Sequence, residues 1–315
     1  MSRIRTIARC GLAVLVIMTW TAEARNSAEQ ELASIRATKA GVDSKNNFWA
    51  WDAKRRMVTR ITPNGDRVES DILPDAWEVD ADQERGIATL SDGGRVINII
   101  EWNGLQKRSI HLLHQGSDVA WLRGSQIAVT PRTTGPCVEI WDTSTGEYLS
   151  GFGTCPDIKI PSSGAVAVRA TLLRYDRAHR EIVTFDAFRG DLITFSETGS
   201  VKRRSHTQNP RDAAIDAWLK QLDRDARLRG GVSYEQIRKY PSMAIAPDQS
   251  IWLGENTDDR GITAVRILQD GTVRRVRIDV QRCASKRFVA WKDDFVFYPD
   301  PSSPQTSCVA VRRRE

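Results

Sequence analysis

The sequence holds few side chains whose types and spacing would support catalysis. It contains no G-x-S-x-G, H-E-x-x-H or C-x-x-C pattern and no glycine-rich phosphate loop. The remaining candidates are oxygen donors, because carboxylate and amide oxygens are the ligands that a calcium-like cation prefers. Glu78, Asp118 and Asn256 are three such residues. The alternative is that these side chains bond to the backbone of their own loops.

Two patterns that look like metal sites have simpler interpretations. His111 and His114 are three residues apart in a predicted strand, so their side chains point to opposite faces. Residues 80–86, DADQERG, begin like a calcium loop, but Arg85 stands where that loop needs glycine and no helices flank it. We interpret this segment as a solvated turn. The sequence therefore predicts no metal site, no cofactor and no catalytic residue.

Aromatic and cationic side chains are the other candidates for contact with a ligand. Most of the 10 tryptophans are explained by packing between repeated units, but Trp77 and Trp218 are candidates for ligand contact. The candidate ligand-binding residues are Trp77, Glu78, Asp118, Arg211, Trp218, Arg238, Tyr240 and Asn256.

Several of these residues lie in a predicted helical insertion, residues 209–241. Asn209 can cap a helix and Pro210 suits its first position. Apolar residues then recur from Ile215 to Leu222 at the spacing of one helical face. The insertion is either a lid that packs its apolar stripe on the strands below, or a lid that also lines a ligand site.

The elements that position these residues are hairpins that recur along the chain. Each has an alternating strand, a turn that ends in glycine, and a more charged strand, a pattern typical of β-hairpins. The turn glycines are Gly65, Gly104, Gly146, Gly199 and Gly271. The first two spacings, 39 and 42 residues, match a four-stranded propeller blade, and the two longer ones require insertions. One is the helical insertion and the other is residues 155–164.

Two further stretches resemble each other closely. AGVDSKNNFWAWDAK (40–54) and AIAPDQSIWLGENT (244–257) each contain a strand, a polar turn and a second strand with tryptophan. We interpret them as the inner hairpins of two blades. The chain is therefore predicted to be an all-β, six-bladed β-propeller over residues 25–315, with the helical insertion between blades four and five. The alternative is a β-sandwich with coincidental hairpins.

Inner hairpins such as IAPDQSIWLGE (245–255) resemble the phrase D-G-x-[IL]-W of NHL and TolB-like propellers, although Gln249 stands where glycine is usual. This resemblance covers residues 31–315 and specifies fold better than function. The last unit has only three predicted strands, so we expect residues 31–36 to donate its outer strand and close the ring.

Gluconolactonase-like six-bladed propellers bind a divalent metal in the central channel. That likeness implies that Glu78, Asp118 and Asn256 face the channel mouth. We expect a binding or interaction module whose working face is marked by the helical insertion. The alternatives are a metal-dependent hydrolase or lyase acting in the channel, and a structural component of the cell envelope.

The N-terminus predicts export. Three arginines precede an apolar run from Cys10 to Trp20, and Ala22-Glu23-Ala24 offers small residues for cleavage. The run is too short to span a bilayer, which needs about 20 residues. We expect residues 1–24 to be a signal peptide, and the mature protein to be periplasmic or secreted, not membrane-spanning, and monomeric. Its partner is a small molecule, a polymer or an envelope protein.

The charge pattern excludes nucleic acid as an expected partner, since the net charge is only +6 and no long polybasic tail is present. Basic runs such as Lys202-Arg203-Arg204 and Arg274-Arg275 either protect outer strand edges or contact an anionic surface.

Four cysteines remain after the signal peptide, an even number that suits an oxidising compartment. We expect disulfides between Cys137 and Cys155, and between Cys283 and Cys308. Four reduced, buried thiols are the alternative.

Overall fold

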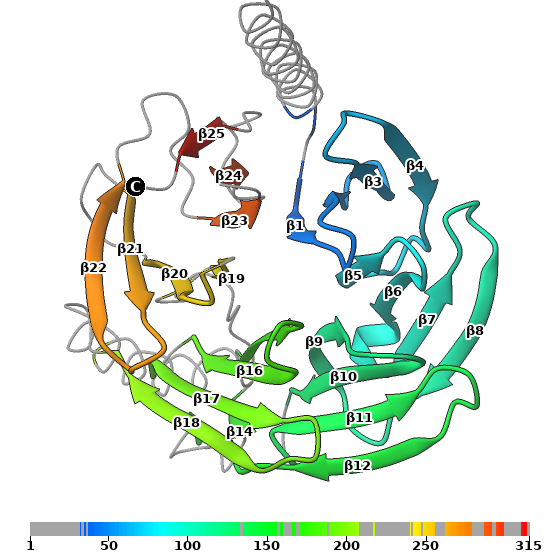
Figure 1. Cartoon of the computed structure of the whole chain (residues 1–315). Coiled ribbons are helices and arrows are strands. Elements are labelled where there is room, and N and C mark those ends of the chain that lie inside the picture. Colours follow the sequence, from blue (N-terminus) through cyan, green and yellow to red (C-terminus); the bar gives the residue numbers. More distant parts are fainter. Residues whose placement is uncertain are drawn as a thin grey trace, which may run out of the picture.

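The chain folds into a β-propeller, in which small antiparallel sheets surround a central axis (Figure 1). The computed structural model describes Leu32, Ile35, 37–132, 135–155, 158–159, 166–167, 171–187, 189–207, Ala217, Tyr240, 242–246, 248–255, 262–278, 287–291, 294–298 and 310–313. Within these ranges, no helix is both long enough and apolar enough to cross a membrane.

Three four-stranded sheets come first along the chain. Blade 1 contains β1 (Lys39–Val42), β2 (Phe48–Asp52), β3 (Met57–Ile61) and β4 (Arg67–Asp71). Blade 2 contains β5 (Glu78–Asp82), β6 (Gly86–Ser91), the short 3-10 helix η1 (Asp92–Gly94), β7 (Val96–Ile100) and β8 (Gln106–His111). Blade 3 contains β9 (Gly116–Trp121), β10 (Gln126–Pro131), β11 (Val138–Asp142) and β12 (Tyr148–Phe152). Strands pair in chain order, and the first strand of each sheet lies innermost (Figure 1).

Two more four-stranded sheets follow. Blade 4 contains β15 (Thr171–Asp176), β16 (Glu181–Asp186), β17 (Asp191–Ser196) and β18 (Val201–His206). Blade 5 contains β19 (Ser242–Ile245), β20 (Ile251–Glu255), β21 (Ile262–Ile267) and β22 (Val273–Ile278). A small ribbon of β13 (Ile158–Lys159) and β14 (Val166–Ala167) precedes blade 4.

The last sheet has three strands, β23 (Arg287–Trp291), β24 (Asp294–Tyr298) and β25 (Ala310–Arg313). The described residues thus form five complete four-stranded blades, where the sequence predicted six, together with this three-stranded sheet. The sheet lies between blade 5 and blade 1 (Figure 1).

A buried apolar cluster lies between each pair of neighbouring sheets. The three-stranded sheet takes part on both of its sides. Phe295 packs edge-on against Trp252 of blade 5, with ring centroids 4.8 Å apart. Trp291 lies 5.6 Å from Phe48 of blade 1, measured between ring centroids. The apolar packing therefore continues around the whole axis.

The turn glycines confirm the predicted hairpins. Gly65, Gly104, Gly146, Gly199 and Gly271 have φ values of 96°, 83°, 83°, 88° and 83°, and each lies between the third and fourth strands of its blade. Glycine adopts this left-handed conformation without steric penalty. The two inner hairpins are confirmed as β1–β2 and β19–β20. Gln249 has a positive φ of 65°, a conformation that glycine adopts without steric penalty.

The residues before blade 1 repeat the connection between blades 1 and 2. The N–H of Ile35 donates to the carbonyl of Leu32 at 3.1 Å, as the N–H of Ala76 donates to the carbonyl of Leu73 at 3.2 Å. Leu32 and Ile35 are buried in the cluster that joins blade 1 to the last sheet. Neither residue lies in a paired strand, so the strand predicted from residues 31–36 is not observed at these two positions. The rest of that segment lies outside the described residues.

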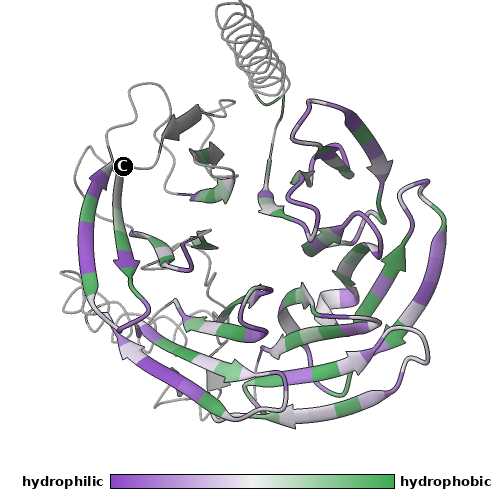
Figure 2. Cartoon of the chain, in the orientation of Figure 1, coloured by the Kyte–Doolittle hydropathy of each residue, from purple (hydrophilic) through white to green (hydrophobic). Residues whose placement is uncertain are grey.

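The outer strands carry the charge that the sequence predicted. Figure 2 shows hydrophilic residues concentrated on outer strands such as β18 and β22. Their exposed cations include Lys202, Arg204 and Arg274, and Arg203 bonds to the carbonyl of Leu268 in blade 5 at 2.9 Å.

The disulfide predicted between Cys137 and Cys155 is present, with the two Cα atoms 4.9 Å apart. Both cysteines are buried in the cluster between blades 3 and 4. Other predictions fall outside the described residues: the signal peptide at 1–24, the pair Cys283 and Cys308, and the helical insertion at 209–241 apart from Ala217 and Tyr240.

Candidate functional site in the axial channel

The innermost strand of each blade turns one edge of backbone N–H and C=O groups toward the axis. Among the described residues no fifth strand pairs with this edge, so its polar groups need other partners. Side chains of adjacent blades bond to several of them. The pairs are Asp43 Oδ2 with the N–H of Gln83 (3.1 Å), Asp80 Oδ2 with the N–H of Trp121 (2.7 Å), Asp118 Oδ2 with the N–H of Leu173 (2.9 Å), Arg174 Nε with the carbonyl of Met243 (3.1 Å) and Arg287 Nη1 with the carbonyl of Thr38 (3.0 Å).

A cluster of ion pairs lies where the inner strands begin. Lys39 Nζ lies 2.7 Å from Glu78 Oε2 and 2.6 Å from Asp118 Oδ1. Arg174 Nη1 lies 3.3 Å from Asp118 Oδ2. Burial by itself raises the pKa of Asp118, but the charges of Lys39 and Arg174 outweigh burial and lower that pKa. Lys39 therefore brings together two of the carboxylates that the sequence identified.

Asp80 lies two residues further along β5 and has a different environment. Glu78, Asp80 and Asp82 share one side of β5, because side chains alternate along a strand. Within the described part of the chain, Asp80 has no ion-pair partner, unlike the acids on either side of it. Burial raises the pKa of Asp80, and the hydrogen bond from Trp121 and the nearby cations offset only part of this rise.

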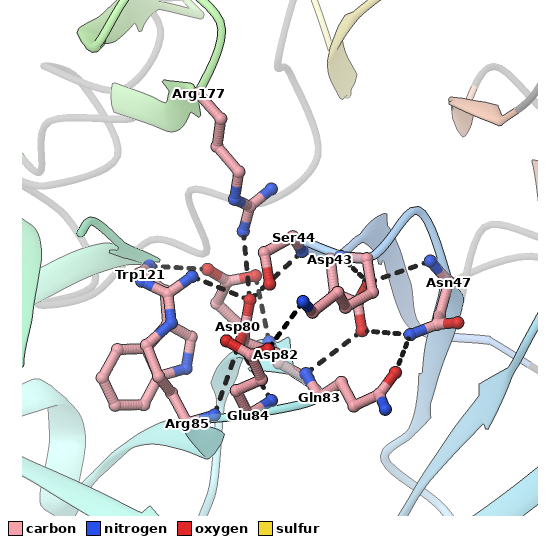
Figure 3. Close-up of polar contacts among 12 residues, drawn as sticks. Asp43, Ser44, Asn47, Asp80, Asp82, Gln83, Glu84, Arg85, Trp121 and Arg177 are labelled. Carbon is pink, nitrogen blue, oxygen red and sulfur yellow. Dashed lines mark hydrogen bonds and ion pairs between the residues drawn. The ribbon is translucent and has the colours of Figure 1, made fainter. Parts of the chain in front are cut away.

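Asp82 lies at the end of β5, in the polar cluster that Figure 3 shows. It is fully buried, pairs with Arg85 Nη2 at 2.7 Å and accepts the N–H of Ser44 at 3.1 Å. Burial raises the pKa of Asp82, but the hydrogen bonds from Arg85 and Ser44 outweigh burial and hold it well below its usual range. The interpretation of residues 80–86 as a solvated turn is therefore wrong for Asp82, because the inner-hairpin turns of blades 1 and 2 enclose it.

Arg177 reaches this cluster from blade 4, on the other side of the axis (Figure 3). It follows directly after β15 in the chain. Its Nη1 donates to the carbonyl of Val42 at 3.3 Å, and its Nη2 lies 3.6 Å from Asp82 Oδ2. Its Nε is buried and has no hydrogen-bond partner among the described residues. Arg177 thus spans three blades through weak contacts.

A cavity of about 210 Å³ lies along the inner strands and extends from Lys39 to Arg177. Its charged lining residues are Lys39, Asp80, Arg174, Asp176 and Arg177. Much of the remaining wall is apolar and includes Val119, Met243 and Ala244. The cavity combines an apolar wall with a few convergent polar groups, as small-molecule sites commonly do.

The cavity reaches the face on which the inner hairpins turn. Asn46, Arg177 and Ala246, which all lie in such turns, contribute to its wall. The inner strands begin on the other face, where Thr207, just after β18, and Tyr240, just before β19, are joined by a 2.9 Å hydrogen bond. The cavity therefore extends to the face opposite to the predicted working face.

The sequence candidates have different surroundings. Trp77 is partly buried against the cluster between blades 2 and 3, and the guanidinium carbon of Arg132 lies 4.8 Å from the centroid of its ring. Tyr240 is fully buried and packs edge-on against Phe185, so it contributes to the core between blades 4 and 5 and not to the cavity. The candidates Arg211, Trp218, Arg238 and Asn256 lie outside the described residues.

Sequence reasoning missed Lys39, Asp80, Arg174 and Arg177. One signal was available: residues 78–82, EVDAD, place three acids at alternate positions of a strand. A surface strand would present such a run to water, but an inner strand presents it to the axis. The cations have no comparable local signal, since Lys39 and Arg177 are distant in sequence from the acids that they meet.

Metal binding by these acids lacks support in the described part of the chain, where no group of three or more histidine, cysteine, aspartate or glutamate side chains could hold an ion. Glu78 and Asp118 are instead engaged by Lys39, and Asp82 by Arg85. None of the four histidines lines the cavity.

Comparisons with known proteins identify the fold alone. The sequence matches no protein-family model and no curated protein. Virginiamycin B lyase from Staphylococcus aureus is similar in structure, with a TM-score of 0.53 and 11% identity over 83% of this chain and 76% of that chain. A streptogramin B lyase structure has a TM-score of 0.52 and 10% identity, and the match covers 90% of this chain and 96% of that chain.

A member of the DUF4221 family from Bacteroides vulgatus has a TM-score of 0.55 and 8% identity, and the match covers 90% of this chain and 95% of that chain. At such low identities these similarities support a propeller and carry no information on ligand or reaction. The resemblance to the NHL and TolB-like kind stays a prediction.

Two isosteric substitutions distinguish Asp118, which is paired with cations, from Asp80, which has no ion pair among the described residues. Asp118→Asn should lower the free energy of unfolding by about 3–5 kcal/mol at neutral pH, because it leaves buried cations without full compensation. Asp80→Asn should leave this free energy unchanged or raise it, because the protein already disfavours the charged form there. Chemical denaturation of both variants measures the difference, and an equal loss in the two would contradict the assignment.

Proposed function

We propose that the chain is an exported, monomeric propeller that binds a small molecule in its axial cavity. One observation carries this proposal. The cavity of about 210 Å³ has on its wall a carboxyl with a raised pKa, Asp80, and a weakly bonded guanidinium, Arg177. A buried carboxyl with a raised pKa and a guanidinium with weak partners both lower the stability of a fold. Such groups are therefore found preferentially at functional sites.

The second candidate function is a hydrolase or lyase that acts in the same channel. The raised pKa of Asp80 favours it, because a general acid or base needs a pKa shifted toward neutrality. A metal-dependent reaction would need oxygen donors from residues beyond the described part. NMR spectra of a bound ligand, followed over hours, separate the candidates: a binding module leaves the ligand intact.

A cavity-filling substitution tests the binding function. Val42 is partly buried at the end of β1 and lines the cavity. Val42→Phe should abolish the rise in Tm that a library of small metabolites produces in the parent protein, because the ring occupies the same space. Val201→Phe, on exposed outer strand β18, is the matched control and should respond like the parent. Equal responses from both variants would contradict a ligand site in the channel.

We also propose that the three-stranded sheet is the sixth blade and that residues just before Leu32 complete it. Two observations support this. The sheet packs on both neighbours as the other blades do, and the hydrogen bond from Ile35 to Leu32 repeats the one from Ala76 to Leu73, which follows the outer strand of blade 1. A fourth strand beside β25 would also cover an exposed edge.

Truncation tests this closure. A chain that begins at Leu32 should have a lower Tm than one that begins at Arg25, by about 2–4 °C for each kcal/mol of lost contact. Circular dichroism during heating measures it. Identical Tm values would show that residues 25–31 add nothing to the last blade.

Export is part of the same proposal and rests on the basic and apolar pattern of residues 1–24. The full-length chain expressed in a bacterium should appear in the periplasm or medium, with an intact mass that lacks these residues. A full-length mass in the cytoplasmic fraction would contradict it.

A further inference from the structure

The geometry points to a small organic anion as the occupant of the axial cavity, held by the Arg177 guanidinium beside the Asp80 carboxyl. This inference deepens the proposed binding function and rests on it. It assigns Arg177 as the group that turns from the channel wall toward the ligand.

The charges on the cavity wall are the first argument. The positive charge of Lys39 is compensated by ion pairs with Glu78 and Asp118, and Arg174 also forms an ion pair with Asp118. Asp176, the other acid on the wall, forms its hydrogen bonds within its own turn. Its Oδ2 lies 2.9 Å from His179 Nδ1, and its Oδ1 accepts the N–H groups of Ala178 and His179. Arg177 and Asp80 remain to face an occupant. A cationic ligand would lie beside three cations and is disfavoured.

The bonding of Arg177 is the second argument. A guanidinium has five N–H donors, but Arg177 has one hydrogen bond at 3.3 Å and one ion-pair contact at 3.6 Å among the described residues. Both contacts are longer than a strong charge-assisted bond, about 2.7–2.9 Å. Asp82 does not depend on Arg177, because Arg85 Nη2 lies 2.7 Å from its Oδ2. Arg177 can therefore move to a ligand without leaving a buried carboxylate unpaired.

The surroundings of Asp80 are the third argument. Its Oδ2 accepts the N–H of Trp121 from β9 at 2.7 Å, and its Oδ1 accepts the N–H of Ala81 at 3.0 Å. The charges of Lys39 from β1, and of Arg174 and Arg177 from blade 4, also act on it. Glu78 and Asp82 flank it on β5. Burial raises the pKa of Asp80, and in its protonated form this carboxyl can donate a hydrogen bond to an oxyanion. The Arg177 guanidinium selects a carboxylate or a phosphate ester, to which protonated Asp80 adds a hydrogen bond, and the apolar wall suits the organic part of the ligand.

The occupant is small. A cavity of about 210 Å³ is below the range of drug-sized sites, about 300–1,000 Å³. Most of its lining residues lie on the inner strands, so it favours a compact molecule with a single charged group.

Matched probes test the ligand class. Benzoate and butyrate are the carboxylates, phenyl phosphate is the phosphate ester, and benzamide and butyramide are their uncharged counterparts. Calorimetry at fixed ionic strength should show that the parent protein binds at least one anion about tenfold or more tightly than the amide of the same shape. Preference for phenyl phosphate over both carboxylates would assign the phosphate ester, and the reverse order the carboxylate.

Arg177→Gln should weaken binding of the preferred anion by about tenfold or more, as expected for the loss of charge-assisted hydrogen bonds. Arg204→Gln removes an equal charge from the exposed outer strand β18 and should change the affinity little. Arg177→Lys, which keeps the charge, should retain part of the affinity. Thermal unfolding confirms that each variant is folded.

The pH dependence gives an independent readout. Ionised Asp80 repels an anion, so affinity in the parent should fall as pH rises through the raised pKa of Asp80. Asp80→Asn should flatten this dependence. Equal effects of Arg177→Gln and Arg204→Gln, or tighter binding of the amides, would overturn the ligand class while leaving a binding cavity. Failure of all five probes to bind the parent at millimolar concentration would overturn this inference. If, in addition, no compound of the metabolite library raised the Tm of the parent, the binding function would be overturned as well.

Discussion

The structure depends on how the backbone N–H and C=O groups on the axial edges of the inner strands find hydrogen-bond partners. Each blade ends inward in a strand with one unpaired row of backbone groups, and an unpaired buried group costs about 1–3 kcal/mol. Charged side chains of adjacent blades supply the missing partners: Asp43, Asp80, Asp118, Arg174 and Arg287 each bond to the backbone of another blade. The bonds that hold neighbouring blades in register therefore also fill the channel with charge.

That charge is not balanced equally along the channel. Where the inner strands begin, Lys39 neutralises Glu78 and Asp118 at short range, which makes this cluster a structural one. At the other end, Arg85 already pairs with Asp82, so Arg177 adds little there. Asp80, between them, bonds to the backbone N–H groups of Trp121 and Ala81 but forms no ion pair among the described residues. Among the charged residues that line the cavity, Asp80 and Arg177 are the two with the weakest partners within the fold, and this is why the site is placed there and not at the better-bonded acids.

The sheets could be predicted from the sequence because the signals for a hairpin lie close together in the chain. A glycine at a positive φ and alternating residues on either side define a hairpin within about 12 residues, and the spacing of such hairpins identified a propeller. The channel could not be predicted in the same way, because Lys39 meets acids 39 and 79 residues away, and Arg177 meets a carbonyl 135 residues away. The one local clue, three alternate acids at 78–82, has meaning only when that strand is known to be innermost. Glu78 and Asp118 were candidates through the likeness to gluconolactonase-like propellers, but their partner Lys39 and their structural role were not identified.

This arrangement also explains why similar folds carry little functional information here. The apolar clusters between blades need only residues of suitable size, so propellers of about 10% identity can share them. The axial positions are alternate residues on short inner strands, and exchanging them leaves those clusters intact. The constraint that remains is that edge groups of the inner strands find polar partners, which many sets of side chains can provide. The chemistry of this channel must therefore be inferred from its own residues: here, a carboxyl whose pKa is raised by burial, on the same cavity wall as an arginine whose other contacts are weak.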